Sequence, residues 1–427
     1  MKKRFLFLGL LFFFCRSNAQ TVAQTRCNNL GKGINLSNWL DAYWDPNWPV
    51  AGVYTKDFLV EMKSAGMKSV RLPVCLALIT DTLPPYAVDT SSSVFQLMDS
   101  VFTWADELNM NVIIDNHNQW VLSDTTWRTV EPRLASLWSV LAKRYCYLDP
   151  ARYSFEIMNE PANIQNDSLR LLFAPVIDTI RKYAPMHTIV VSPTSWSNGV
   201  GYSDWLPLAD TNLMYTFHSY DPFPFTHQGF SWVNPPLPTG VVFPHPIFDA
   251  LIYVNWGLSM QWMDSFKLPV FLGEFGVGIN ADDNSRCNWI DTIGGLIDYH
   301  HLSSFSWDVR GNFPLYKSGV VGHDSIIPCF STALHLYENQ QTAVSQIPDN
   351  SSIKIFPNPA CETLSVVCSD GNSAQRLQLI NSFGDLMLEI EIHQSTQINL
   401  ANLSAGLYLV KIQNGQKFST QRLIITK

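Results

Sequence analysis

The sequence predicts an α/β fold, a (β/α)8 TIM barrel, followed by a small all-β sandwich domain. Two observations predict the barrel: eight short apolar runs alternate with longer amphipathic stretches, and polar residues stand where the apolar runs end. A third observation predicts the sandwich, because the chain beyond residue 352 changes to short alternating runs between turn-forming residues. A length of 427 residues accommodates one large domain and one lesser one.

The N-terminus has the pattern of an export signal. A basic start, MKKR, precedes an apolar segment from Phe5 to Phe14 and a small-residue cleavage site, so residues 1–19 are expected to be removed as a signal peptide. This segment is too short to span a bilayer, and we expect no transmembrane segment in the mature chain. The protein is therefore expected to leave the cell, or to reach its surface, through the periplasm.

The cysteines favour a mostly reduced state. Of eight cysteines, Cys15 lies in the leader, which leaves seven, so at least one thiol has no partner within the chain. For four of them the apolar surroundings predict buried, reduced side chains: Cys75, Cys146, Cys287 and Cys329. The spacing of Cys and His indicates no metal site, and no cofactor is implied.

Eight apolar runs are the predicted barrel strands. They lie at residues 31–37, 69–74, 111–117, 153–160, 188–193, 212–220, 269–276 and 302–309. A doubly wound open sheet would require a glycine-rich phosphate turn after the first strand, and GKGINLSNW contains no GxGxxG pattern. Amphipathic stretches that predict helices separate the runs, at residues 55–66, 93–108, 132–145, 169–183, 248–266 and 288–299. The helix expected near Trp205 has the weakest pattern.

Polar residues gather at the ends of the predicted strands. A barrel brings the carboxyl ends of all its strands to one mouth, so residues far apart in sequence are expected to converge there. The candidates are Asn35, Arg71, His117, Asn159, Glu160, His218, Tyr220, Glu274 and Trp307.

Long aromatic connections are expected on the same side of the barrel. Residues 221–246 are rich in Phe and Pro without a helix or strand period, which is typical of a functional loop, and we expect it to wall a cleft. Tryptophans that follow the first, third and fifth strands could offer flat faces to sugar rings, although aromatic residues fill cores equally well: Trp39, Trp44, Trp48, Trp120 and Trp196.

Two carboxylates at strand ends across a barrel mouth are the minimum equipment for cleaving a glycosidic bond. One must be protonated to serve the leaving oxygen, and the other must be ionised to attack the anomeric carbon. Glu160 and Glu274 are the candidate pair, with Arg71 and Tyr220 available to keep one carboxylate charged and oriented. A formal net charge of -8 argues against nucleic acid as a partner. We expect a monomer.

These motifs resemble glycoside hydrolase family 5, whose members are (β/α)8 retaining glycosidases. FEIMNEP resembles the family's acid/base motif and FLGEFG its nucleophile motif, which implies Glu160 as the acid/base and Glu274 as the nucleophile. SVRLPV, IIDNHN, FHSYDPF and SFSWDV match further active-site positions, so the resemblance implies substrate contacts from Arg71, His117, Asn159, His218, Tyr220 and Trp307, and we add Asn35 and Trp39.

The resemblance implies a secreted retaining endo-β-1,4-glucanase that acts on a β-linked polysaccharide. Other β-glycans stay open as substrates, namely mannan, xyloglucan and β-1,3-glucan. A non-catalytic glycan-binding protein on a degenerate barrel is the alternative from another class, and it predicts the loss of a carboxylate, whereas Glu160 and Glu274 are both present.

The C-terminal region is predicted to follow a polar linker. We expect the catalytic domain at residues 20–338, the linker at 339–352 and the β-sandwich at 353–427. KIFPNPACETLSV, GLYLVKI and RLIITK resemble the C-terminal sorting domain of the type IX secretion system, which implies that secretion machinery as a partner. A carbohydrate-binding module is the alternative, but the tail has no Trp to form a flat sugar platform.

Overall fold

A computed structural model describes the protein at residues 21–118, 122–245, 249–309, 311–317, 326–337, 353–358, 360–368, 375–381, 385–393, 395–414 and 417–426. The expected signal peptide and linker, and Trp120, lie outside these residues. The chain divides into two compact units, Met1–Gln341 and Thr342–Lys427, and each is described by itself. Among the described residues, no helix combines the length and the apolar character that crossing a membrane requires.

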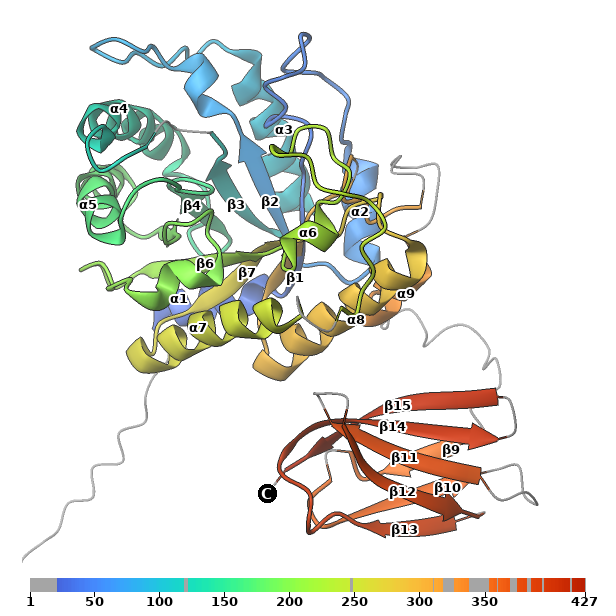
Figure 1. The fold of residues 1–427 in the computed structure, drawn as a ribbon. Coiled ribbons are helices and arrows are strands. Elements are labelled where there is room, and N and C mark those ends of the chain that lie inside the picture. Colours follow the sequence, from blue (N-terminus) through green and yellow to red (C-terminus); the bar gives the residue numbers. More distant parts are fainter. Residues whose placement is uncertain are drawn as a thin grey trace, which may run out of the picture. The chain divides into compact units, whose positions relative to one another are not determined.

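The first unit is a closed barrel of eight parallel strands in sequence order, which confirms the predicted fold class (Figure 1). Each strand has most or all of its residues buried, as expected for a sheet covered on both faces. The strands are β1 (Lys32–Asn35), β2 (Ser69–Val74), β3 (Asn111–Asn116), β4 (Tyr153–Glu156), β5 (Thr188–Val191), β6 (Leu213–Ser219), β7 (Val270–Phe275) and β8 (Ser304–Ser306).

Helices surround the barrel and bury one apolar face each against it (Figure 1). Several begin at a side-chain cap, as α2 does at Thr55, whose hydroxyl accepts a hydrogen bond from Phe58 N–H. They are α2 (Lys56–Ser64), α3 (Ser93–Glu107), α4 (Trp127–Tyr145), α5 (Asn166–Tyr183), α7 (Ala250–Phe266), α8 (Asp283–His300) and α9 (Pro328–Ala333). Two 3-10 turns, η1 (Leu76–Ile79) and η2 (Gly199–Ser203), and the short α6 (Phe223–Thr226) complete the connections. The weak helical pattern after β5 corresponds to η2.

A helix that the sequence analysis did not predict covers the amino-terminal end of the barrel. This helix, α1 (Val22–Leu30), buries Ala23, Cys27 and Leu30 in one cluster with five strand side chains: Ile113, Val190, Met214, Phe271 and Phe305. Ser303 Oγ, just before β8, donates to the Cys27 carbonyl at 2.7 Å. The helix therefore closes the end of the barrel opposite the predicted mouth.

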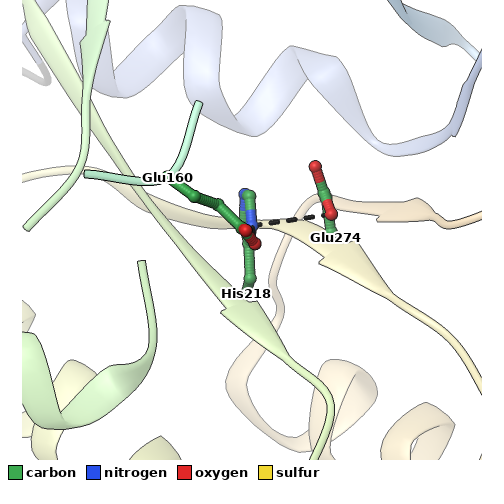
Figure 2. Close-up of side chains that lie close together, drawn as sticks. All are labelled: Glu160, His218 and Glu274. Atoms are coloured by element: carbon green, nitrogen blue, oxygen red, sulfur yellow. Dashed lines mark hydrogen bonds and ion pairs between the residues drawn. The ribbon is translucent and has the colours of Figure 1, made fainter. Parts of the chain in front are cut away.

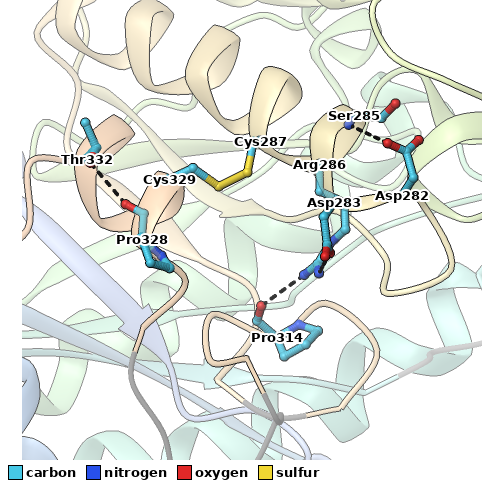
Figure 3. The surroundings of a disulfide bond; sticks show 9 residues. All are labelled: Asp282, Asp283, Ser285, Arg286, Cys287, Pro314, Pro328, Cys329 and Thr332. Atoms are coloured by element: carbon cyan, nitrogen blue, oxygen red, sulfur yellow. Dashed lines mark hydrogen bonds and ion pairs between the residues drawn. A yellow bond between two sulfur atoms is a disulfide. The ribbon is translucent and has the colours of Figure 1, made fainter.

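The expectation of buried, reduced cysteines is wrong for three of the four residues. Cys287 and Cys329 are not reduced, and Cys146 is not buried. Cys287 of α8 and Cys329 of α9 form a disulfide, although 42 residues separate them in the chain (Figure 3). Their apolar surroundings result from the packing of α9 on α8, which places the two Cα atoms 5.6 Å apart. Cys75 is buried and free as expected, whereas Cys146 is free but exposed at the end of α4.

The second unit is a two-sheet β-structure, as the alternating pattern predicted (Figure 1). One sheet has the order β13-β10-β9 and the other the order β12-β11-β14-β15. Their inner faces share one apolar core that includes Leu364, Leu377, Val410 and Leu423. The strands are β9 (Ile353–Phe356), β10 (Thr363–Cys368), β11 (Gln375–Asn381), β12 (Leu386–Ile392), β13 (Ser395–Asn399), β14 (Gly406–Asn414) and β15 (Lys417–Ile425). The sequence analysis did not identify β9 and β13 as strands.

Candidate active site

Glu274 is the fifth residue of β7, and two side chains bind its carboxylate, one from β2 and one from just after β6. Arg71 Nη1 donates to Glu274 Oε1 at 2.7 Å, and Tyr220 Oη donates to Oε2 at 2.7 Å. Burial and the neighbouring Glu274 carboxylate raise the pKa of Tyr220 well above its ordinary value, so the phenol stays a donor. Both oxygens of Glu274 are thus held and oriented by hydrogen-bond donors.

Glu160 lies four residues beyond the end of β4 rather than at its tip, because β4 stops at Glu156. Its Oε1 is 2.6 Å from His218 Nδ1. The Glu160 side chain is 25% exposed, so most of it is enclosed while part of it is accessible to solvent. Burial raises the pKa of Glu160 to about 7, and the positive charges of His117 and Arg71 only partly oppose that rise. Glu160 therefore holds a proton at a pH where an ordinary glutamate would have lost it.

The two carboxylates converge on His218 of β6 (Figure 2). His218 Nδ1 is 3.6 Å from Glu274 Oε2, and one oxygen each from Glu160 and Glu274 lie within 4.8 Å of one another. Burial lowers the pKa of His218 to about 4, so the imidazole is neutral at most working pH values and donates one N–H. The two carboxylates thus face one site from different surroundings, Glu274 beside a guanidinium and a phenol and Glu160 beside an imidazole.

The same three side chains could also ligate a metal ion. They offer two carboxylate oxygens and one imidazole nitrogen, a donor set that Zn²⁺ accepts. Each donor already has a protein partner, however, because His218 binds Glu160 and Tyr220 binds Glu274. The contacts within the protein thus account for the arrangement of all three groups.

His117 and Trp307 form a second part of the site. The two rings stack with centroids 5.2 Å apart and an interplanar angle of 11°. Burial opposes a charge on His117, but Asp115, whose Oδ2 is 2.7 Å from His117 Nδ1, raises the pKa of the ring to about 9. His117 Nε2 is 3.3 Å from Asn159 Nδ2. If the His117 ring were protonated, two N–H groups would face each other there, so this contact opposes a positive charge on His117.

A left-handed turn after β5 presents Trp196 beside Glu160. Three consecutive residues other than glycine, Ser195, Trp196 and Ser197, have φ values of 65°, 55° and 55°. Such a conformation costs about 1–2 kcal/mol per residue, so other contacts must hold it. Trp196 N–H donates to the Pro161 carbonyl at 3.1 Å, and Ser197 Oγ donates to the Asn159 carbonyl at 2.9 Å. The turn is therefore fixed to the Glu160 loop, and Trp196 is 59% exposed.

The long connection after β6 forms an aromatic cluster that starts at Tyr220. His227 lies in its centre, and burial lowers the pKa of this ring to about 3. His227 stacks on Phe223 at 4.0 Å and meets Tyr220 edge-on at 5.3 Å. Trp232 lies against the same histidine at 5.4 Å and is 56% exposed. The predicted functional loop thus carries exposed aromatic faces next to a residue that binds Glu274.

Three candidate substrate-binding residues are buried and act differently from the expectation. Arg71 and Asn35 are 0% exposed, and Asn35 Oδ1 accepts from Arg71 Nη1 at 3.0 Å, so this pair holds Glu274 rather than facing the opening. Trp39 is 2% exposed and its Nε1 donates to the Val50 carbonyl at 2.7 Å. A ring packed on both faces offers no surface to a sugar, so Trp39 is a core residue. Trp44 is the exposed tryptophan of that loop.

Two buried acids in the barrel strands escaped the sequence analysis. Asp115 of β3 and Glu156 of β4 are 0% exposed, and both bind Arg71, at 3.0 Å and 2.7 Å. Their signal was a charged residue directly after a buried apolar residue of a predicted strand, which requires a buried partner of opposite charge. Arg71, itself inside a strand, was that partner.

An eight-stranded parallel barrel with opposed carboxylates at its carboxyl-terminal end defines a class of enzyme, the (β/α)8 glycoside hydrolases. Residues 24–313 match the model of the family described as Cellulase (glycosyl hydrolase family 5). The chain belongs to this family. Residues 354–426 match the model of the secretion system C-terminal sorting domain, which agrees with the resemblance seen in the tail.

Several endoglucanases are similar to the chain. Endoglucanase 3 of Fibrobacter succinogenes is 24% identical over 337 residues, 68% of this chain and 51% of that protein. Endoglucanase H of Acetivibrio thermocellus is 28% identical over 286 residues, 65% of this chain and 29% of that protein. The chain therefore matches only about half or less of each of these two relatives.

Solved structures share the barrel. A hyperthermophilic endo-beta-1,4-glucanase in complex with substrate is 27% identical, with a TM-score of 0.66, and the match covers 74% of this chain and 100% of that one. Thermotoga maritima Cel5A in complex with cellobiose is 26% identical, with a TM-score of 0.66, covering 73% and 99%. Thermotoga maritima Cel5A in complex with mannotriose gives the same identity and TM-score, 26% and 0.66, over 73% and 99%.

Proposed function

We propose that this protein is a secreted, retaining endo-β-1,4-glucanase, with Glu160 as acid/base and Glu274 as nucleophile. The observation that carries the proposal is the pair itself, whose oxygens lie within 4.8 Å of one another in unlike environments. Retaining enzymes have carboxyl groups about 5–5.5 Å apart, whereas inverting enzymes need about 6.5–9.5 Å to admit a water. The names of the related endoglucanases support the substrate class.

In the first step, Glu274 Oε2 or Oε1 attacks the anomeric carbon of the sugar. Glu160 gives its proton to the glycosidic oxygen, and the carbon–oxygen bond breaks with its electron pair on the departing sugar. A covalent glycosyl ester of Glu274 results. The raised pKa of Glu160, about 7, keeps the required proton in place in mildly acidic solution, where an ordinary glutamate would be ionised.

In the second step, Glu160 acts as a base. It takes a proton from water, whose oxygen attacks the anomeric carbon, and Glu274 leaves as a carboxylate. Two inversions at the same carbon give net retention. His218 N–H can donate to Glu160 Oε1 in both protonation states, because a carboxylic acid still has an acceptor oxygen.

Substrate binding is assigned to the aromatic surfaces around this centre. We assign Trp307, stacked on His117, to the sugar whose anomeric carbon is attacked. We assign Trp196, held beside Glu160, to the sugar of the leaving group. A flat indole suits the apolar face of a glucose ring, and Trp196 is exposed whereas Trp307 is partly buried. Asn159, which accepts from Arg71 Nη2 at 2.7 Å, is fixed for contact with the hydroxyl next to the anomeric carbon.

Export is proposed to use the type IX secretion machinery. The match of residues 354–426 to a secretion sorting domain supports this route, together with the signal peptide expected at residues 1–19. The mature enzyme is placed outside the cell or on its surface.

Hydrolysis of a panel of polysaccharides by the full-length mature protein tests the function. Soluble cellulose derivatives should be cleaved internally, with a rapid fall in viscosity, and Glu160→Ala and Glu274→Ala should abolish this. Wild-type rates in both variants would contradict the assignment of the pair. Binding without turnover on every β-glycan would instead revive the non-catalytic alternative.

A β-mannan is the second candidate substrate. The mannotriose complex of Thermotoga maritima Cel5A shows that a similar barrel accepts a mannose oligomer. Glucose and mannose differ in the orientation of one hydroxyl, so the contacts around that hydroxyl decide between them. Comparison of kcat/KM on cello- and manno-oligosaccharides of equal length separates the two.

A further inference from the structure

Arg71 donates all five of its N–H groups to acceptors within the protein. Nη1 donates to Asn35 Oδ1 at 3.0 Å and to Glu274 Oε1 at 2.7 Å. Nη2 donates to Asn159 Oδ1 at 2.7 Å and to Glu156 Oε1 at 2.8 Å. Nε donates to Glu156 Oε2 at 2.7 Å. A guanidinium has five N–H groups, so no donor is left for a substrate.

Glu156 is the one residue that binds two nitrogens of this guanidinium side-on. A bidentate pair fixes both the position and the plane of an arginine head group, because two parallel hydrogen bonds allow neither rotation nor sliding. With the Nε–Nη2 edge held, the remaining N–H groups have fixed directions. One of them points at Glu274, and another at Asn159, the residue that precedes Glu160.

The buried charges around Arg71 do not balance with one cation. Asp115 of β3, Glu156 of β4 and Glu274 of β7 all lie within 3.0 Å of the guanidinium, and His117 faces Asp115 from the same side. Burial raises the pKa of Glu156, with Arg71 acting in the opposite direction. Enclosing this carboxylate is costly, and a buried ion pair of this kind is weak evidence for a stabilising role. Its position therefore calls for a role beyond stability.

We propose that Glu156 is a positioning residue of the active site, which orients Arg71 so that one guanidinium holds both the Glu274 carboxylate and Asn159. This inference rests on the proposed function of Glu274 as nucleophile. Glu156 itself touches no substrate, since it is fully buried inside the barrel. Its effect is expected on the chemical step rather than on substrate binding.

Two variants separate the geometry of Glu156 from its charge. Glu156→Gln keeps the shape but replaces one acceptor by an amide N–H that meets an N–H of Arg71, so we expect kcat to fall at least thirtyfold, with KM within threefold. Glu156→Asp keeps the charge but is one methylene too short to reach both nitrogens, so kcat should fall similarly. Only the Gln variant removes a buried negative charge, so only it should move the alkaline limb of the pH profile to lower pH.

A matched control exists at the opposite end of the barrel. Arg181 of α5 holds Asp210, just before β6, by the same edge, with Nε to Oδ2 at 2.6 Å and Nη2 to Oδ1 at 2.9 Å. Asp210→Asn breaks an equivalent bidentate pair before the start of β6, whereas the candidate site residues lie at the carboxyl ends of the strands. It should lower Tm while leaving kcat and KM within twofold of wild type. The apparent pKa values of the pH profile should stay unchanged.

The outcomes distinguish this inference from the proposed function. If wild type hydrolyses no β-glycan, the proposed function fails. If wild type is active and both Glu156 variants keep kcat within twofold, Glu156 is not a positioning residue. Rates are expressed per active site, titrated with a fluorosugar that traps the glycosyl-enzyme, so partial unfolding cannot imitate the effect. In an Arg71→Lys background, Glu156→Gln should lower kcat by less than a further threefold, because Glu156 acts through Arg71. If Glu156→Gln lowered kcat in that background as much as in the wild type, the inference would also be overturned.

Discussion

The raised pKa of Glu160 gives the most quantitative prediction. A glutamate with the ordinary value of 4.5 would be protonated to only about 3% at pH 6, whereas a pKa of about 7 gives about 90%. We therefore expect kcat/KM on cello-oligosaccharides to be nearly constant from pH 5.5 to 6.5 and to fall about tenfold per unit above pH 7, as the general acid loses its proton.

The Glu160→Gln variant isolates this effect. With a dinitrophenyl cellobioside, whose leaving group needs no proton, pre-steady-state glycosylation by the variant should retain most of its rate and lose the alkaline limb near pH 7. On cellulose derivatives the same variant should lose about 10²–10⁴-fold, the usual contribution of a general acid. An alkaline limb that persists near pH 7 in the variant would assign that limb to another group and refute the reasoning.

The same pKa shift has a consequence for stability. Because the folded-state pKa lies above the unfolded value, Glu160 favours folding below pH 4.5, and this contribution is lost as pH rises through about 7. Glu160→Gln should therefore gain stability over wild type above pH 7, by at most about 3 kcal/mol, and show a smaller gain at pH 4. Thermal unfolding at the two pH values measures the difference, and an equal effect at both would contradict it.

Three further predictions concern separate parts of the barrel unit. Tyr220→Phe removes a donor to Glu274 and should lower kcat about 10- to 100-fold with little change in KM, measured by steady-state kinetics. Cys287→Ser opens a loop of 42 residues, worth about 4 kcal/mol of chain entropy, and should lower Tm by about 5–10 °C, whereas Cys146→Ser, a free exposed thiol, should leave Tm unchanged. Trp196→Ala should raise KM for long cello-oligosaccharides about tenfold, and less for substrates with an aryl leaving group.

The fold was predictable because its signal repeats. Each strand is a short buried run and each helix an amphipathic one, so errors in single boundaries did not alter the count of eight strands. The closure of the barrel also made the convergence of Glu160 and Glu274 predictable, since topology alone brings strand ends together. The least certain helix, after β5, is a 3-10 turn, in which Gly199 lies against the Asn255 carbonyl of α7 and Gly201 against the Thr194 carbonyl, just after β5.

The contacts that tune the site were less predictable, because burial is decided in three dimensions. Trp39 and Trp196 both follow a strand, but one is packed into the core and the other is held outward by a left-handed turn. Glu156 is the last residue of β4, and its burial depends on Arg71 of β2, two strands away in the barrel. The disulfide depends on the docking of α9 against α8, which local sequence does not encode.

Retention by double displacement requires that Glu274 form a covalent bond to the sugar. The most direct test treats the protein with a dinitrophenyl deoxyfluoro-β-cellobioside, which slows the second step, and locates the modified residue by peptide mass spectrometry. We predict one sugar per chain, attached to Glu274 in the FLGEFG peptide, and slow release of a product of retained configuration. A label on any other residue, or an inverted product from the natural substrate, would contradict the mechanism.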